Sequence, residues 1–561
     1  MLYPSTILFG SFLVANVLGF AFITIPPTHN SVGKRWVPRS ASSSLAYSQT
    51  TRRVGRTTLE PKRYWRHQDS RRCQNRRSDT TKVTGALAAA ESDDDGEEVF
   101  PTRSPVVASS TNEPERICVL GGGFGGLYTA LRLQKMPWRG RKPIVTLVDK
   151  RDKFTFLPLL YEFAIGNAEL DEVAPTFREL LAGSGVSFVQ GCVSDVDLDD
   201  KKVSVVGAVA DDLDGFMISD NADQARTIKY DKMVLAVGAE PASGIDKVPG
   251  AREHAIPFYS IEDSYRVKQA ITKLKVLAKE AATVRVVVVG GSYAGVELSC
   301  NLATELSERK GMSKVEVTLA TGSEVLSSAT PSNREAGLRR LKESGVNVMM
   351  GTRVAEVKKG GVVVLQQSGE KEGPASADGE ELEANLLVWT AGSQPSTLVE
   401  SLDVQKDSKG RIEVDRRLRL VSGVHDDGNG GGRGGDVYCL GDIATVEGMD
   451  LGCTAQVAIQ QSDYVAYNIW ADKDRRKPLD FRFLDLGEVM NLGGLDGAVS
   501  ALGGRVKLTG KAAGLARRAI YAVRMPTNPQ RVRAAASAAA GTAFSITSAV
   551  LEKGMDILER T

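Results

Sequence analysis

The sequence is poor in the residues that metal and thiol chemistry require. Its 561 residues include only four histidines, and its six cysteines are scattered without a CxxC pair or metal-ligand spacing. We therefore expect no bound metal. Only Cys192 and Cys453 form a loosely plausible redox pair, and no motif surrounds either of them. The chain after residue 25 also lacks an apolar run long enough to span a bilayer.

Positive charge is concentrated near the N-terminus. The formal net charge is only +2, but residues 31–90 are rich in lysine and arginine and contain just three acids, Glu60, Asp69 and Asp79. The rest of the chain is therefore acidic. This distribution gives no reason to expect nucleic-acid binding.

The N-terminal residues look like a targeting leader. Residues 5–25 are apolar and uncharged, and no lysine or arginine occurs before Lys34. About 20 apolar residues can cross a bilayer, so a single membrane span is one interpretation. The favoured one is a signal-type segment followed by an Arg/Ser/Thr-rich, acid-poor transit segment. This two-part layout resembles leaders that carry proteins into plastids with extra membranes, which predicts a plastid location, with the mitochondrion as an alternative.

Alternating apolar runs and helical stretches predict a parallel α/β fold. We expect two Rossmann-like dinucleotide-binding domains, the second inserted into the first, and a C-terminal membrane-associating helical tail. A hairpin is expected near residues 359–361, and surface insertions at 368–380 and 426–436. The predicted segments are 1–114 (leader and acidic linker, mostly disordered), 115–282 (flavin domain, first part), 283–384 (nicotinamide domain), 385–480 (flavin domain, second part) and 481–561 (membrane association or dimerisation).

The first glycine-rich turn predicts a nucleotide site. Gly121, Gly123 and Gly126 match G-x-G-x-x-G after an apolar strand. Such glycines allow a tight turn, close approach of a pyrophosphate and close packing of the next helix, whose N-terminal N–H groups face the phosphates. Asp149 ends the following strand and is placed to accept hydrogen bonds from a ribose. Phe124 and Gly125 complete this set of candidate residues.

A second element favours FAD in that site. An apolar strand at 437–440 ends in Gly441-Asp442, and in two-dinucleotide flavoenzymes this Asp binds the ribityl–phosphate part of FAD. The alternative is an ordinary turn aspartate. Ala455 and Gln456 are further candidates, since a helix starting near Ala455 would aim N–H groups at the flavin ring. Gly238 is also a candidate residue of this site.

The second glycine-rich turn predicts a site for a visiting nicotinamide. Gly290, Ser292 and Gly295 occupy the three fingerprint positions, with serine replacing the middle glycine. The matching strand ends in Thr321, where the first site has an acid. A carboxylate facing a 2′-phosphate would cost on the order of several kcal/mol at an effective dielectric near 20, so its absence admits NADPH as well as NADH. The other candidate residues of this site are Tyr293, Ala294, Glu297 and Gly392.

Glu297 has two interpretations. An acid in the first turn of a helix is stabilised by the helix dipole. The same carboxylate could instead reach the contact between nicotinamide and flavin. The sequence leaves both open.

Taken together, these motifs resemble type II (alternative) NAD(P)H:quinone oxidoreductases. The resemblance spans roughly residues 115–525, and segments 293–297, 172–175 and 483–488 point to the plastid C1-type members and their cyanobacterial counterparts. It implies non-covalent FAD and transfer of two electrons to a membrane quinone without proton pumping. For C1-type members it implies plastoquinone or a demethylated naphthoquinone of phylloquinone synthesis as acceptor. The segments that carry the likeness are 121–126, 154–160, 386–392, 440–442 and 454–460.

The residues themselves predict where the quinone binds and how the membrane is reached. Gln456 and Gln460 lie four apart on one helix face among small apolar residues, which suits a ring with carbonyl oxygens. A neutral polar helix face is the alternative. In 515–525 a helical wheel separates an apolar arc from Arg517, Arg518, Tyr521 and Arg524, as in a helix lying in the bilayer interface. Further on, a second apolar stripe consists of Phe544, Leu551, Met555 and Leu558. Packing on the body or on a second subunit predicts the same kind of stripe.

Two rival functions stay open. A sulfide:quinone oxidoreductase shares the expected architecture but needs a pair of redox cysteines beside the flavin. A redox-sensing protein would bind FAD and NAD(P)H with negligible turnover. Ser292 is compatible with that alternative, because it replaces the glycine expected beside the pyrophosphate.

Overall fold

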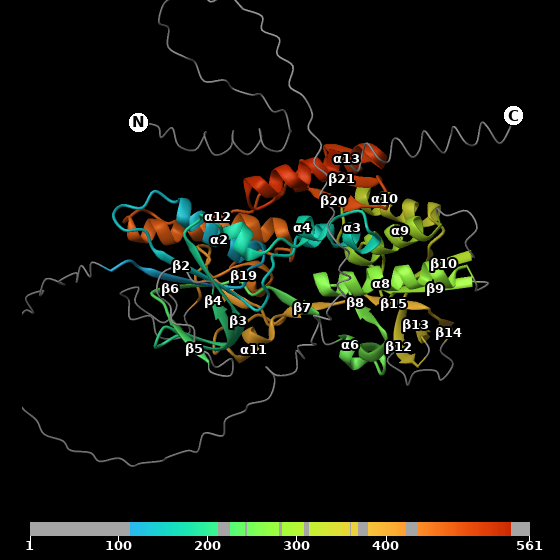
Figure 1. Cartoon of the computed structure of the whole chain (residues 1–561), viewed down its shortest axis with the longest axis horizontal. Helices are drawn as coiled ribbons and strands as arrows, with labels where there is room; N and C mark the ends of the chain where they lie inside the picture. The colour runs from blue at the N-terminus through green and yellow to red at the C-terminus, as the bar shows by residue number, and fades with distance from the viewer. Residues whose placement is uncertain are drawn as a thin grey trace, which may run out of the picture. The chain divides into compact units, whose positions relative to one another are not determined.

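A computed structural model describes residues 113–210, 225–241, 244–279, 283–307, 314–359, 361–367, 380–421 and 435–539 (Figure 1). The predicted leader up to residue 112, most of both predicted insertions, and the apolar series from Phe544 to Leu558 lie outside the described residues.

The first sheet has seven strands, and the first glycine turn directly follows the strand that is third in its order. The first five strands in its order pair in parallel, which requires crossover connections, and the last two are added by antiparallel pairing. In sheet order the strands are β18 (Val437–Cys439), β6 (Lys232–Leu235), β1 (Arg116–Leu120), β2 (Ile144–Asp149), β3 (Val186–Asp197), β4 (Lys202–Ala210) and β5 (Arg226–Lys229). Helices α2 (Phe124–Lys135) and α12 (Ala455–Lys473) lie side by side (Figure 1).

The second sheet has five parallel strands around the second glycine turn. Their order is β11 (Asn347–Met350), β10 (Lys314–Thr321), β9 (Thr283–Val289), β15 (Leu386–Trp389) and β8 (Ile256–Pro257). Strands β15 and β8 lie outside 283–384, so this sheet extends on both sides of the segment that the sequence assigned to the nicotinamide domain. The accompanying helices are α8 (Ile261–Leu277), α9 (Tyr293–Ser307) and α10 (Pro331–Glu343).

Smaller elements complete the described residues. The expected hairpin is confirmed, since β12 (Thr352–Lys358) and β13 (Val362–Gln367) pair antiparallel around Gly361. The chain passes between the two large sheets twice, and these passages pair antiparallel as β7 (Ala239–Pro241) and β16 (Ser393–Pro395). The remaining elements are β14 (Glu380–Glu383), β17 (Ile412–Val414), β19 (Ala444–Val446), α3 (Leu160–Ile165), α4 (Leu170–Val173), α5 (Phe177–Leu181), α6 (Gly244–Lys247), α7 (Ala251–His254), α11 (Thr397–Ser401), η2 (Leu157–Leu159) and η3 (Gly441–Ile443).

The C-terminal region packs on the body through a small sheet and a helix. Strands β20 (Glu488–Asn491), β21 (Gly497–Ala501) and β22 (Val506–Thr509) form an antiparallel sheet, and α13 (Gly510–Arg524) packs on it (Figure 1). Among the described helices, none has the length and apolar character needed to cross a membrane.

The two faces of α13 differ from those drawn from the sequence. Arg517, expected on the polar side, is 1% exposed and forms an ion pair with the buried Glu162 of α3. Leu515 and Val523, from the expected apolar arc, are 44% and 43% exposed. The helical wheel separated these residues correctly, but the exposed position expected for Arg517 is wrong. Its guanidinium is buried because it pairs with Glu162, which is distant in sequence.

Candidate active site

The first glycine turn has the geometry that its sequence predicts. Gly121 has a φ of +96°, and its backbone N–H donates to the Val148 carbonyl at 2.8 Å. A Cβ added to Gly126 would lie 1.8 Å from the Gly121 carbonyl oxygen, so only glycine lets α2 start this close to the strand. A Cβ on Gly123 would meet no atom within 4 Å. The turn therefore encloses open space at its middle glycine.

Asp149 lies against this turn at the end of β2. Its carboxylate accepts hydrogen bonds from the backbone N–H of Gly122 at 2.7 Å and of Arg151 at 2.8 Å. The acid is thus held in a fixed orientation beside the glycines, and its binding of a ribose stays a prediction.

The Gly-Asp segment meets the same turn from the other side. A Cβ on Gly125 would lie 2.9 Å from Leu440 Cδ1, so the start of α2 and the end of β18 are in contact. Gly441, with a φ of +78°, donates its N–H to Gln461 Oε1 at 2.7 Å. Gln461 is buried and is not among the residues predicted from the sequence; the only signal for it there is its position one residue after Gln460.

These features fit the pyrophosphate and ribityl parts of FAD. Burial raises the pKa of Asp442, and no hydrogen bond to its carboxylate is found within the described residues. The N-cap of α2 is Gly123, which has no side chain to accept the free N–H groups of the first helical turn. The oxygens of a bound phosphate would accept hydrogen bonds from those N–H groups. Phe124 contributes its backbone there, because its ring packs in the core at 5.2 Å from that of Phe154.

The second glycine turn has the same backbone hydrogen bond and the same close glycine contact as the first. Gly290 has a φ of +119°, and its N–H donates to the Ala320 carbonyl at 2.9 Å. A Cβ on Gly295 would lie 1.7 Å from the Gly290 carbonyl oxygen. Ser292 occupies the position of Gly123 and is exposed, so the fold accepts its side chain.

Thr321 takes the place that the acid has in the first site. A Cβ on Gly291 would lie 2.6 Å from Thr321 Oγ1, and this hydroxyl accepts the N–H of Ser323 at 3.4 Å. The two bonding patterns are alike, since Asp149 also accepts the N–H two residues ahead. A neutral hydroxyl therefore replaces a carboxylate at equivalent positions of the two sites.

Glu297 is deeply buried in α9 and is not in the first turn of that helix. The helix-dipole interpretation therefore fails. Its carboxylate accepts the N–H of Asn491 at 2.7 Å, which ties α9 to β20. Burial raises the pKa of Glu297 to about 7, although the nearby charge of Arg517 opposes the shift. A carboxyl group with this pKa can hold or release a proton near neutral pH.

Two further candidate glycines flank the passages between the sheets. Gly238 and Gly392 have φ values of +70° and +78° and directly precede β7 and β16. The Gly238 carbonyl accepts the N–H of Ser396 at 3.1 Å, so the two passages are also tied together beside the paired strands.

Gln456 and Gln460 share one face of α12, as expected, and both bind the backbone of 484–487. Gln456 Oε1 accepts the N–H of Leu486 at 3.0 Å, and Gln460 exchanges two hydrogen bonds with Leu484, at 2.8 and 3.0 Å. These contacts give both glutamines a structural role that neither interpretation of the sequence included. The N-cap Thr454 accepts the N–H of Val457 at 3.2 Å, which leaves the amide of Ala455 outside this cap.

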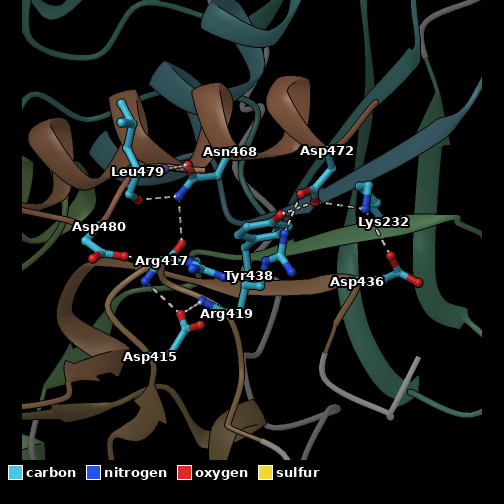
Figure 2. Close-up of polar contacts among 10 residues, drawn as sticks. All are labelled: Lys232, Asp415, Arg417, Arg419, Asp436, Tyr438, Asn468, Asp472, Leu479 and Asp480. Atoms are coloured by element: carbon cyan, nitrogen blue, oxygen red, sulfur yellow. Dashed lines mark hydrogen bonds and ion pairs between the residues drawn. The ribbon is translucent and has the colours of Figure 1, made fainter. Parts of the chain in front are cut away.

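Polar contacts at the far end of α12 hold the helix in place (Figure 2). Asp472 accepts a hydrogen bond from the Tyr438 hydroxyl at 2.7 Å and pairs with Lys232 at 3.4 Å. Lys232 also pairs with Asp436 at 3.0 Å, which joins α12 to β6 and β18. Asn468 donates to the backbone of the neighbouring segments at 2.9 and 3.1 Å. This network orients the helix whose other end meets the Gly-Asp turn.

Comparisons with known proteins agree with this geometry. The family model described as pyridine nucleotide-disulphide oxidoreductase matches residues 115–462. The chain is 36% identical over 424 residues to the demethylphylloquinone reductase NdbB of Synechocystis, covering 74% of this chain and 94% of that protein. It is 35% identical over 447 residues to the alternative NAD(P)H-ubiquinone oxidoreductase C1, chloroplastic/mitochondrial, of Arabidopsis thaliana, covering 75% and 80%.

A solved structure shares the fold. NDH2 from Plasmodium falciparum in complex with NADH aligns with a TM-score of 0.62 and 18% identity, covering 76% of this chain and 97% of that chain. The family model spans more than half of the sequence, and two relatives exceed 30% identity over most of their length. The chain therefore belongs to the pyridine nucleotide-disulphide oxidoreductase family and, within it, to the type II NAD(P)H:quinone oxidoreductases.

Proposed function

We propose that the protein is an FAD-dependent NAD(P)H:quinone oxidoreductase that passes two electrons from a soluble nicotinamide to a lipid quinone. The observation that carries this proposal is the pair of equivalent glycine turns, one with Asp149 and one with Thr321 at the matching strand end. One turn suits a resident dinucleotide and the other a visiting one. Bound FAD supplies the redox chemistry, and the protein supplies placement and electrostatics.

The residues of each site have separate roles in this proposal. Gly121, Gly123 and Gly126 shape the turn for the FAD pyrophosphate, and Asp149 and Asp442 bind its hydroxyl-bearing parts. For the nicotinamide, the turn around Ser292 binds the pyrophosphate and Thr321 faces the adenosine ribose. Glu297, whose carboxylate accepts the N–H of Asn491, is proposed to be a proton-holding group for the contact between nicotinamide and flavin. We propose that residues 115–282 and 385–480 form the flavin domain and that residues 283–384 form the nicotinamide domain. Strands β8 and β15, from outside 283–384, complete the sheet of the nicotinamide domain.

The proposal is tested by reconstituting the protein with FAD and mixing it with NADPH or NADH and a short-chain quinone. Continuous nicotinamide oxidation coupled to quinol formation is expected. A protein that bleaches its flavin once and stops would be a redox-sensing binding protein. If the correctly folded protein, reconstituted with FAD, showed no visible flavin absorbance, the proposal would be refuted. Sulfide-dependent quinone reduction that a Cys453→Ser substitution abolishes would favour the rival enzyme.

The quinone is proposed to bind beside Gln456 and Gln460, next to the backbone of 484–487. Both amides already hydrogen-bond that segment, so a bound ring would lie against a surface that these contacts keep in place. Gln456→Ala should lower quinone reduction more than NADPH-to-ferricyanide turnover. Equal losses in the two assays would mean that the glutamine is only structural. The acceptor is proposed to be plastoquinone or a demethylated naphthoquinone, since one relative is named a demethylphylloquinone reductase.

Membrane association is proposed to use the outer face of α13 and the region around it. Leu515, Val523 and the following Val532 are exposed, and Arg518 and Arg524 flank them. Apolar side chains bordered by basic ones favour an anionic membrane surface. The double substitution Leu515→Ser/Val523→Ser should reduce co-sedimentation with anionic vesicles. Val276→Ser, which removes an apolar side chain that is even more exposed but lies on α8, is the control.

The protein is proposed to work in a plastid, with the mitochondrion as the second candidate. The Arabidopsis relative carries both locations in its name, and the N-terminal sequence matches a two-part leader. Sequencing the mature N-terminus tests this, and a start before about residue 34 would contradict two-step import. Dimerisation through the C-terminal region is an additional proposal that size-exclusion chromatography with light scattering addresses.

A further inference from the structure

An arginine from a neighbouring strand lies at the end of β10. A Cβ added to Gly322 would lie 3.0 Å from Arg353 Cγ and 3.1 Å from its Nε, so the arginine side chain passes directly over this glycine. Gly322 follows Thr321, the last residue of β10. Strand β11 ends beside it, because Thr321 pairs with Met350, and the turn at Gly351 then leads into β12 and Arg353.

This place corresponds to the ribose-binding edge of the first site. Thr321 lies against Gly291 of the second turn, as Asp149 lies against Gly122 of the first, although only Asp149 accepts a hydrogen bond from its glycine among the described residues. In addition, the N–H of Leu326 donates to the Gly291 carbonyl at 2.7 Å, which folds the loop after β10 onto the glycine turn. A group bound by this turn therefore has its ribose next to Thr321 and Gly322.

The positive charge at this edge has no partner among the described residues. The Arg353 side chain is exposed, and no hydrogen bond or ion pair to it is found within the described residues. Glu324, the acid of the same loop, is already paired with Arg334. The end of β10 therefore combines a strand end without a carboxylate and a guanidinium that no described side chain pairs with. A guanidinium binds phosphate through two parallel hydrogen bonds.

We propose that Arg353 binds the 2′-phosphate of NADPH and is the residue that determines selectivity for NADPH over NADH. Gly322 leaves the space in which the arginine side chain lies, and the exposed residue Ser323 belongs to the same edge. This inference rests on the proposed function in one respect, namely that the second turn binds a nicotinamide dinucleotide.

The test measures binding without redox chemistry. Calorimetric titration of the FAD-loaded protein with 2′,5′-ADP and with 5′-AMP reports the contribution of the 2′-phosphate alone. Wild-type protein should bind 2′,5′-ADP more tightly than 5′-AMP. Arg353→Gln should weaken 2′,5′-ADP binding by about tenfold to 100-fold and leave 5′-AMP binding within about twofold. Arg339→Gln, which removes an exposed arginine of α10, should change neither affinity.

Two results would overturn the inference: equal affinity of the wild-type protein for both ligands, or an unchanged preference in Arg353→Gln. The effect should also weaken at high salt, because an exposed ion pair is screened. NADH-dependent quinone reduction by the same preparations separates this inference from the proposed function. If Arg353→Gln retains that activity while its phosphate preference disappears, both stand. If the wild-type protein lacks that activity, the proposed function fails, and the titration still decides the role of Arg353.

Discussion

Two glycines of the first turn should respond in opposite ways to the same substitution. In Gly126→Ala, the new Cβ would lie 1.8 Å from the Gly121 carbonyl oxygen, whereas an ordinary contact needs about 3.4 Å. In Gly123→Ala, nothing lies within 4 Å of the new Cβ. Gly123 also has a φ of −73° and an extended backbone, which any residue adopts. The first substitution therefore strains the protein itself, and the second affects only what binds in the turn.

The structure sets the size of both effects. The obstacle in Gly126→Ala is backbone, so the start of α2 would have to move by more than an ångström. Overpacking of this kind costs about 1–3 kcal/mol, and a backbone obstacle places the cost near the upper end. Gly123→Ala should leave the stability of the flavin-free protein unchanged or raise it by about 0.4–1 kcal/mol, because alanine restricts the unfolded chain. Its Cβ would nevertheless stand where the pyrophosphate approaches the backbone.

The assay combines urea unfolding of the flavin-free variants with equilibrium titration by FAD. Gly126→Ala should lower the free energy of unfolding before any cofactor is added. Gly123→Ala should unfold like the wild-type protein but bind FAD more weakly. If Gly123→Ala retained full FAD affinity, the turn would not be the pyrophosphate site. If both variants lost the same stability without FAD, the packing argument would be wrong.

Three further outcomes are expected. Arg517→Met should destabilise the protein by about 3–5 kcal/mol in urea unfolding, because it leaves the buried Glu162 unpaired, and adding Glu162→Gln should recover part of the loss; no recovery would contradict the ion-pair explanation. Burial raises the pKa of Glu297 from 4.5 to about 7, so the folded protein binds a proton that the unfolded chain releases, and stability should fall as pH rises from about 4.5 to 7. That decline should be smaller in Glu297→Gln, and identical pH profiles would refute the assignment. Ser292→Gly should increase affinity for NAD(P)H by removing a side chain beside the pyrophosphate, and titration with NADP⁺ checks this without turnover.

The sequence by itself determined the two nucleotide turns. A strand, a glycine turn, a helix and a second strand are neighbours along the chain, so their contacts depend on local geometry. For this reason the roles of Gly121, Gly126 and Gly290 in the turns and the placement of Asp149 and Thr321 beside them agree with the structure. Family resemblance extended this reading to the cofactor and the acceptor.

Only the tertiary structure decided which distant side chains meet these turns. Arg353 reaches Gly322 because β10 and β11 end together, and Arg517 is buried because Glu162 lies opposite it. Likewise, β15 joins the second sheet by pairing with β9, about 100 residues earlier in the chain. Hydrophobic periodicity reports which face of a segment is apolar, but it does not identify the partner that covers that face or neutralises a charge on it. Those partners are set by the packing of the whole unit.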